Sequence, residues 1–289
     1  MEIKYKGIIL LIFIMKTYIY STHFNIPEYI DLQFTSLKKY FQSDFEFIVI
    51  NDAKIKGDLT NFNQLDLEEK INNICNKNNI NCSRFPQEYH NNRKFLFSNT
   101  IEPKTNNAVT RCADVTQFCI NHFTENYNKG YLMILDADMF FINYFNILNF
   151  MENHNVGGIK QKMGYLWNGI CIFDSKLNLK ELNFDCGYVN NEPVDVGGQT
   201  YYFMKKYDNI IKYIPITCSH YTFEETFENE SDNIKKILLE YCNLREDKSA
   251  NKEIILNNCI LHIRSGGNWD YRTKEFKYKE LDIIKNYIN

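Results

Sequence analysis

The sequence has no strong charge of either sign. Across 289 residues, 33 Lys and Arg stand against 36 Asp and Glu, which gives a formal net charge of −3. Nucleic-acid-binding domains usually carry a basic surface, and solvating tails carry runs of acidic residues. Because the sequence has neither feature, we expect no nucleic acid among its partners.

The sequence also lacks the cysteine spacings of a zinc knuckle or a disulfide framework. None of its nine cysteines forms a Cys-x-x-Cys pair. Cys75 and Cys82 lie seven residues apart, as do Cys112 and Cys119, which suits neither kind of site. Several cysteines lie in apolar segments, where a free thiol behaves as a small hydrophobic group. We therefore expect a reducing, cytoplasmic compartment.

The apolar run at the N-terminus is too short to span a membrane. Residues 7–15 make nine apolar or small positions, whereas a membrane-spanning helix needs about 20. Lys4 and Lys6 before the run are typical of a signal peptide, but no small-residue cleavage site follows it. We expect the run to be the buried first strand of a parallel sheet, with a targeting signal or anchor as the alternative.

Internal repeats and low-complexity linkers are absent, so we expect a single domain over residues 1–289. Strand-like and helix-like segments alternate in the first half, and this order predicts an α/β fold with a parallel sheet wrapped by helices. After the first strand, the expected elements are a helix over 28–41, a strand over 45–50, a helix over 65–77, a strand over 80–85, a surface loop over 86–107, a helix over 108–123 and a strand over 131–135.

The second half is less regular, and we expect it to extend the sheet. Its expected strands cover 157–160, 166–173 and 257–263, and its expected helices cover 199–207 and 232–242.

Polar residues follow two of the expected parallel strands. Asn51 and Asp52 come after one strand, and Asp136 and Asp138 come after another. In parallel sheets, ligands bind outside the carboxyl ends of the strands. We therefore expect these four side chains at one rim of the sheet.

The clearest functional signal is Asp136-Ala137-Asp138, directly after the apolar run 131–135. Residues i and i+2 of an extended segment point to the same side. Two neighbouring carboxylates in a half-buried site repel each other unless a cation lies between them. A divalent ion with oxygen ligands removes this repulsion and also bridges a diphosphate. An exposed turn is the alternative, but the apolar residues on both sides favour a metal site.

Residues 131–141, Tyr-Leu-Met-Ile-Leu-Asp-Ala-Asp-Met-Phe-Phe, resemble the metal-binding strand of GT-A-fold glycosyltransferases. The resemblance implies a GT-A-like (Rossmann-like) fold, a mixed, mostly parallel sheet flanked by helices. It also implies that Asp136 and Asp138 hold Mn²⁺ or Mg²⁺ against the phosphates of a nucleotide-diphosphate-sugar donor. The implied reaction moves the sugar to a hydroxyl of a glycan, protein or small-molecule acceptor. The donor-binding half would be 1–141 and the acceptor-side half 142–289.

Three later segments extend the resemblance in chain order. Residues 167–174 are similar to the segment that lines the acceptor side, which makes Trp167 and Asn168 candidates for contact with a sugar. Residues 195–200 are similar to the acidic helix start that reaches the sugar or the acceptor. Residues 261–269 resemble the late His-x-x-Gly-x-x-Lys-Pro-Trp motif of the glycogenin-like and bacterial galactosyltransferase group.

The late motif implies that His262 is a further metal ligand and that Gly266 and Gly267 approach the diphosphate. In this chain the glycine falls one residue later than in the family, and Asn268 stands where Lys-Pro would be. The phosphate contact therefore passes to Arg264 or to backbone N–H groups. A core histidine at the end of an apolar strand is the alternative for His262.

The remaining candidates each have a structural alternative. Asp195 is a general base for the acceptor hydroxyl, as inversion requires, or a ligand of a donor-sugar hydroxyl, and an N-cap role is compatible with both. Trp167 is a sugar-stacking platform or a core residue. Asn51 and Asp52 contact the base or ribose, or form a turn. Arg111 pairs with a rim carboxylate or a phosphate, or is an exposed helix charge.

Two other functions remain open. An apolar strand followed by Asp-x-Asp also opens the motif of haloacid-dehalogenase-type phosphatases. That motif has Thr or Val directly after the second Asp, whereas Met139 follows here, and 135 residues precede Asp136. A non-catalytic, glycosyltransferase-like binding module would keep the core and lose the metal ligands, so the surviving aspartate pair argues against it.

Overall fold

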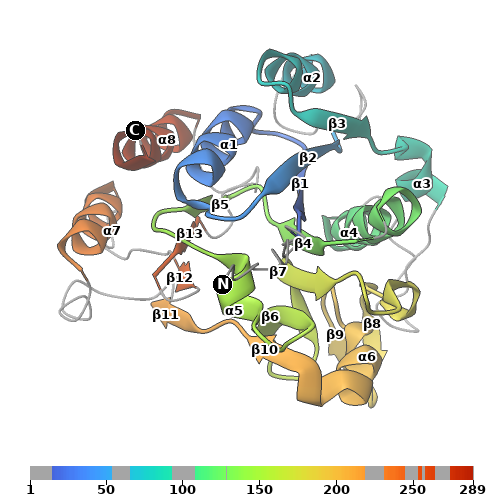
Figure 1. The fold of residues 1–289 in the computed structure, drawn as a ribbon. Coiled ribbons are helices and arrows are strands. Elements are labelled where there is room, and N and C mark those ends of the chain that lie inside the picture. The colour runs from blue at the N-terminus through green and yellow to red at the C-terminus, as the bar shows by residue number, and fades with distance from the viewer. Residues whose placement is uncertain are drawn as a thin grey trace, which may run out of the picture.

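The structure is a computed structural model that describes residues 15–53, 66–92, 108–127, 129–218, 231–244, 253–255, 258–263 and 274–288. Its centre is a seven-stranded sheet flanked by helices, which confirms the expected single α/β domain (Figure 1). In spatial order, the strands of this sheet are β10 (Ile211–Tyr213), β6 (Val156–Lys160), β7 (Leu166–Asp174), β4 (Tyr131–Leu135), β1 (Thr17–His23), β2 (Phe45–Asn51) and β3 (Asn81–Arg84).

The first half of the chain builds the parallel part of this sheet. β1 pairs in parallel with β2 on one side and with β4 on the other, and β2 pairs in parallel with β3. β7 runs antiparallel to both β4 and β6, so the sheet is mixed, as expected. The carboxyl ends of β1, β2 and β4 share one rim, and the Asp-x-Asp pair follows β4 there.

The strand β1 lies inside the sheet, between β4 and β2. The run expected to be the first strand, residues 7–15, lies outside the described residues except for Met15. Side chains of β1 alternate between the faces, because Ile19 belongs to one apolar cluster and Tyr20 to the other. The polar residues Ser21 and His23 are also buried, and they contact each other at 3.1 Å. These polar side chains hide the strand from a search for apolar runs.

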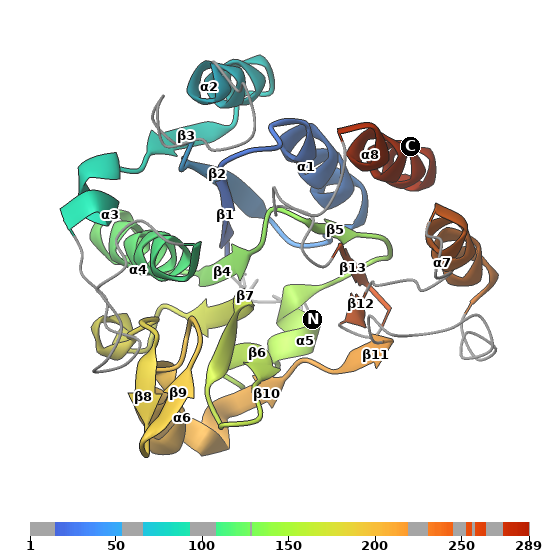
Figure 2. The same cartoon turned by 180° about the vertical axis from the view of Figure 1, so that it is seen from behind.

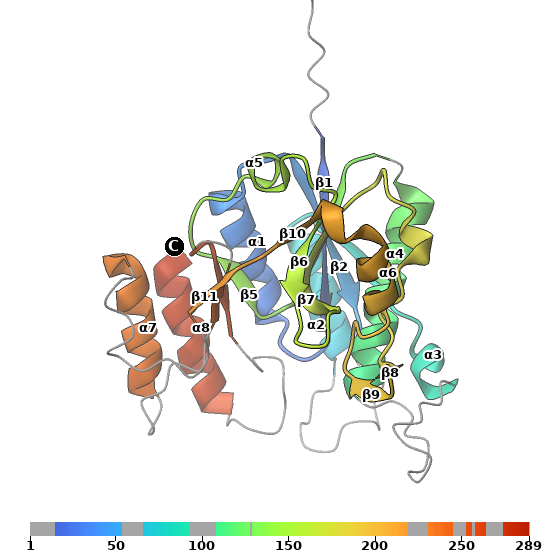
Figure 3. The ribbon, with the colours of Figure 1, turned by 90° about the horizontal axis from the view of Figure 1, so that it is seen from below.

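Helices cover both faces of the sheet, with α1 on one side and α4 and α6 on the other (Figure 3). The helices are α1 (Glu28–Tyr40), α2 (Leu67–Lys77), α3 (Gln87–Asn92), α4 (Ala108–Asn126), α5 (Ile147–Met151), α6 (Thr200–Tyr207), α7 (Asp232–Leu244) and α8 (Lys274–Ile288), with short 3-10 turns η1 (Leu179–Glu181) and η2 (Asp208–Ile210). Among the helices in the described part of the chain, none combines the length and apolar character needed to cross a membrane.

A second sheet brings the C-terminal part of the chain back to the Asp-x-Asp segment. Its strands, in order, are β11 (Ile216–Cys218), β12 (Glu253–Ile255), β13 (Ile260–His262) and β5 (Met139–Phe141). β13 pairs antiparallel with β5, which places His262 opposite Met139. A third apolar cluster joins this sheet to α7 and α8. Figure 1 and Figure 2 both show α8 beside α1, with which it is in contact.

Short elements account for most differences from the expected ones. Residues 87–92 form α3 within the segment that we expected to be a loop, and the rest of that segment, 93–107, lies outside the described residues. β5 has three residues, too few for a period to show in the sequence. The hairpin of β8 (Gly187–Val189) and β9 (Glu192–Val194) is equally short, and it was not expected either.

Candidate metal centre

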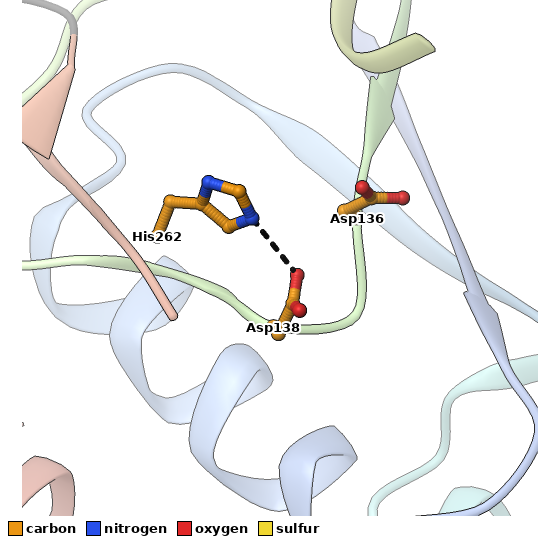
Figure 4. A group of neighbouring side chains, drawn as sticks. All are labelled: Asp136, Asp138 and His262. Atoms are coloured by element: carbon orange, nitrogen blue, oxygen red, sulfur yellow. Dashed lines mark ion pairs between the residues drawn. The ribbon is translucent and has the colours of Figure 1, made fainter. Parts of the chain in front are cut away.

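Three side chains converge at the rim of the sheet. Asp136, Asp138 and His262 each offer one ligand atom, and these atoms all lie within 4.8 Å of one another. Nε2 of His262 lies 3.5 Å from Oδ1 of Asp138 (Figure 4). Asp138 and His262 are buried, and Asp136 is half-buried. Such a set of two carboxylates and one imidazole is typical of a metal site, and three ligands leave coordination positions free.

The two aspartates meet through a turn, which corrects the expected geometry. β4 ends at Leu135, and the N–H of Met139 donates to the carbonyl of Asp136 at 3.1 Å. Asp136 and Asp138 therefore lie in a four-residue turn rather than on the same side of an extended strand. The chain reverses there because β5 begins at Met139 and pairs with the second sheet. We call residues 136–139 the metal turn.

His262 reaches the metal turn through strand pairing. β13 lies antiparallel to β5, and the N–H of Ile263 donates to the carbonyl of Asp138 at 2.9 Å. This backbone bond fixes the distance between the histidine and the turn, although more than 100 residues separate them in the sequence. The indole of Trp167 covers the imidazole of His262, with 5.1 Å between the ring centroids. His262 is thus buried, yet it faces a carboxylate rather than an apolar core.

The electrostatics of the site favour a bound cation. Burial, followed by the charge of Asp138, raises the pKa of Asp136 to about 7, and His262 partly offsets both effects. Two carboxylates at this distance do not both ionise readily near neutral pH, unless a positive charge is shared between them. The donor set of hard oxygens and one imidazole suits Mn²⁺ or Mg²⁺. The residues present therefore fit the metal that the sequence implies.

The strand β7 forms the next wall of the site. The N–H of Asp136 donates to the carbonyl of Gly169 at 2.8 Å. A Cβ at Gly169 would collide with the ring of Trp167, so the glycine lets the indole lie against the strand. Trp167 is half-buried and packs against the core, which agrees with its core interpretation, and contact with a sugar stays a prediction. Asn168, expected on the sugar side, is buried beside these residues.

Cys112 belongs to the site, although the sequence indicated only an apolar helix face. Nδ2 of Asn168 lies 3.0 Å from Sγ of Cys112. Burial raises the pKa of the Cys112 thiol well above its usual value, and the charges of Asp136 and Asp195 raise it further. The charges of Asp136 and Asp195 therefore both act on the thiol of Cys112. Cys112 lies near the start of α4, and the fold places this end of the helix at the rim.

Asp195 is exposed, its charge acts on Cys112, and it does not cap a helix. Its Oδ1 accepts a hydrogen bond from the N–H of Val196 at 2.8 Å. α6 begins only at Thr200, and its N-cap is Gln199, so the N-cap interpretation of Asp195 was wrong. The chain makes an extra turn before the helix, because Gly197 adopts a φ of +87°. The carboxylate of Asp195 remains open to solvent.

Asp52 and Arg111 lie in a buried network at the end of β2. Nη2 of Arg111 lies 2.8 Å from Oδ2 of Asp52, and Nε2 of Gln87 donates to Oδ1 of Asp52 at 2.7 Å. The ring of His90 lies between Asp52 and Asp114, 3.0 Å from one carboxylate oxygen of each. Arg111 therefore pairs with a rim carboxylate and is not an exposed helix charge. This network joins α3 and α4 to the rim.

The other residues that we expected to contact the nucleotide-sugar donor are Asn51, Arg264, Gly266 and Gly267. Asn51 is fully buried, and its Nδ2 donates to Oδ1 of Asn72 at 2.9 Å and to a backbone carbonyl of α2 at 3.1 Å. Its side chain anchors α2 to the sheet. The expected diphosphate contacts Arg264, Gly266 and Gly267 lie outside the described residues.

No protein-family model matches the chain, and no curated protein matches it in sequence. Among solved structures, the chain is similar to an active-site mutant of LgtC, a GT-A-fold glycosyltransferase, at 10% identity and a TM-score of 0.40. The similarity covers 94% of this chain and 96% of that one. The structure itself shows a mixed, mostly parallel sheet with an Asp-x-Asp pair at its rim, as the sequence indicates.

Proposed function

We propose that this chain is a metal-dependent glycosyltransferase that moves a sugar from a nucleotide-diphosphate donor to an acceptor hydroxyl. The observation that carries the proposal is the convergence of Asp136, Asp138 and His262 within 4.8 Å at the carboxyl rim of the sheet. Ligands of open α/β sheets bind at this rim. A diphosphate is the ligand that most needs a divalent cation there, because its charge is concentrated on a few oxygens.

Each ligand of the proposed cation site has a defined place. Asp136 and Asp138 supply carboxylate oxygens, and Nε2 of His262 supplies the third ligand atom. A Mn²⁺ or Mg²⁺ ion held there would neutralise charge on the departing nucleoside diphosphate. In the reaction, the bond from the anomeric carbon to the diphosphate oxygen breaks, and the diphosphate leaves with the electron pair. The acceptor oxygen forms the new bond and loses its proton.

We assign the sugar to the space between β7 and the start of α4. Trp167 offers a ring face for stacking, and Asn168 lies beside it. Asp195 is an exposed carboxylate whose charge acts on Cys112 at this space. It accepts a hydrogen bond from a sugar hydroxyl, or takes the proton of the acceptor where the transfer inverts the anomeric carbon.

We assign the nucleotide to the side of the rim where β2 ends. There the ion pair of Asp52 and Arg111 supports the wall of the site, and Asn51 holds the adjacent helix α2 in place. Arg264, with Gly266 and Gly267, would complete the diphosphate contact. In this proposal residues 1–141 bind the donor and residues 142–289 build the acceptor side.

A screen of nucleotide sugars for release of nucleoside diphosphate tests this function. We expect at least one donor to be cleaved in the presence of Mn²⁺ or Mg²⁺, and EDTA to stop the release. The double variant Asp136→Asn with Asp138→Asn should lose the release and remain folded by circular dichroism. Asp282→Asn, on the exposed face of α8, is the matched control and should keep full activity. Full activity in the double variant would refute the proposed metal site.

A further inference from the structure

The metal turn rests on two buried polar side chains of α1. Gln33 and Ser36 are both fully buried, although α1 otherwise presents apolar residues such as Ile30 and Leu37 to the core. A buried amide or hydroxyl in such a place is costly unless it is hydrogen-bonded. Both side chains bond to the segment that includes the metal turn and β5.

Gln33 binds both ends of the metal turn. Its Nε2 donates to the carbonyl of Asp136 at 2.8 Å and to the carbonyl of Met139 at 3.1 Å. These two residues are the first and the last of the turn, which the bond from the N–H of Met139 to the carbonyl of Asp136 closes. An amide nitrogen has two hydrogens, and each carbonyl takes one of them. The amide therefore holds the turn at a fixed width.

The orientation of the Gln33 amide follows from its partners. Carbonyl oxygens only accept, so Nε2 must face the turn and Oε1 must face away from it. Oε1 lies 3.2 Å from Nε2 of His23, and the carbonyl oxygen can only accept there, so His23 donates. His23 is buried at the end of β1, and its Nε2 also lies 3.1 Å from the hydroxyl of Ser21. A flip of the Gln33 amide would lose both of its bonds to the turn.

Ser36 fixes the strand that follows the turn. Its hydroxyl donates to the carbonyl of Gln33 at 2.7 Å and accepts from the N–H of Phe141 at 3.2 Å. The strand β5 also contacts α1 along its length, so this helix holds both the turn and its exit strand. The carboxylate of Asp138 faces His262 (Figure 4), and one ligand atom of Asp136 lies within 4.8 Å of those of the other two residues.

We propose that Gln33 is a positioning residue for the metal centre: it sets the width of the metal turn so that both carboxylates reach one cation. The proposal rests on the metal site of the proposed function, and Gln33 itself touches neither metal nor substrate. A turn that is held before binding loses less conformational freedom when the ion arrives. Groups that orient metal ligands typically change metal affinity about 10- to 100-fold when they are removed.

The test measures the binding of Mn²⁺ to the full chain by electron paramagnetic resonance, with no nucleotide-sugar donor present. We expect Gln33→Met, which keeps the length of the side chain and removes its donors, to weaken Mn²⁺ binding about 10-fold or more. The spectrum of the bound ion should broaden, because the carboxylates no longer hold one geometry. Gln42→Met, at an exposed glutamine just beyond α1, is the matched control and should bind Mn²⁺ as the wild type does.

The outcomes separate this inference from the proposed function. A wild-type chain that binds no Mn²⁺ contradicts both. A wild-type chain that binds Mn²⁺, and a folded Gln33→Met variant with the same affinity and spectrum, contradicts the inference alone. Should Gln33→Met not fold, Gln33→Asn decides, because it keeps a polar amide that is one methylene too short to bond both carbonyls of the turn. Weaker Mn²⁺ binding in Gln33→Asn supports the inference, and unchanged binding overturns it.

Discussion

At the scale of single residues, two glycines with the same backbone angle differ in their surroundings. Gly164 and Gly197 both have a φ of +87°, where any other residue is strained by about 1–2 kcal/mol. A Cβ at Gly164 would make only ordinary contacts with Tyr201, whereas a Cβ at Gly197 would collide with the backbone carbonyl of Leu166. The pair therefore separates the effect of the backbone angle from the effect of close packing.

We expect Gly197→Ala to lower the free energy of unfolding by clearly more than Gly164→Ala does. Gly164→Ala should cost about 1–2 kcal/mol from its backbone angle alone. Gly197→Ala should cost roughly 1–3 kcal/mol beyond that, because β7 must move away from the new methyl group. Urea denaturation of both variants measures the difference. Equal losses would show that the carbonyl of Leu166 gives way without cost.

Among single residues, His23 also makes the free energy of unfolding depend on pH. Burial lowers the pKa of His23 to about 4, although its hydrogen bond with Gln33 acts in the opposite direction. In the unfolded chain a histidine titrates near 6.5. Between these values the unfolded chain binds a proton that the folded chain does not, so stability falls as the pH falls.

We expect His23 to remove up to about 3 kcal/mol of stability as the pH falls from about 6.5 toward 4. Unfolding free energies measured in urea across this range, for the wild type and His23→Gln, provide the test. The variant should lose less stability over the same range, because it has no proton to bind. Parallel curves would show that His23 is not the group responsible.

At the scale of elements, α7 and α8 hold the second sheet against α1. Leu238 of α7, Ile284 of α8 and Phe140 of β5 are all fully buried in one apolar cluster, which also contains Leu261 of β13. The strand β5 leads out of the metal turn, and its partner β13 carries His262. Packing in this cluster therefore supports the site, although these four side chains offer no ligand atom.

We expect Leu238→Ala to destabilise the fold by about 2–5 kcal/mol, because it opens a cavity in this cluster. Leu148→Ala is the matched control, since Leu148 on α5 is 42% exposed and should cost less than about 0.5 kcal/mol. Thermal or urea unfolding measures both. A loss no larger than the control's would mean that α7 is not part of the cooperative core.

At the scale of the whole molecule, ligand binding distinguishes an enzyme from a binding module. A ligand that binds only the folded chain stabilises it by about 2.7 kcal/mol at 100 times its Kd. We expect Mn²⁺ together with a nucleoside diphosphate to raise the Tm by roughly 5–10 °C. Asp136→Asn with Asp138→Asn should remove this shift. A shift without any release of nucleoside diphosphate from a nucleotide sugar would favour the module, and no shift would contradict both.

The sequence alone located most elements of the parallel half of the fold, with β1 as the exception. Strong periods located α1 and β2, and the uninterrupted apolar run located β4. The Asp-x-Asp pair was found because two acidic residues directly after an apolar strand are typical of a metal site. The later motif pointed to His262, which the structure places beside Asp138. Each of these signals is local, so neighbouring residues were enough to reveal it.

Other features needed the tertiary structure, because they depend on contacts between distant segments. β1 was overlooked, since its buried polar residues Ser21 and His23 interrupt the apolar pattern, and the contact of His23 with Gln33 of α1 appears only in the fold. The metal turn closes only because β5 pairs with β13, and Cys112 enters the site only because α4 starts at the rim. Gln33 reads as one more polar position on a helix until the fold places it beneath the turn.

The sequence by itself determined the fold class and pointed to the three candidate metal ligands, because periodicity and short motifs are properties of adjacent residues. The tertiary structure decided how Asp136 and Asp138 face each other, how His262 reaches them and what holds them there. Those decisions depend on strand pairing and on buried hydrogen bonds between residues more than 100 positions apart. Local sequence preferences do not specify such pairs, because the two residues come together only when the whole chain packs.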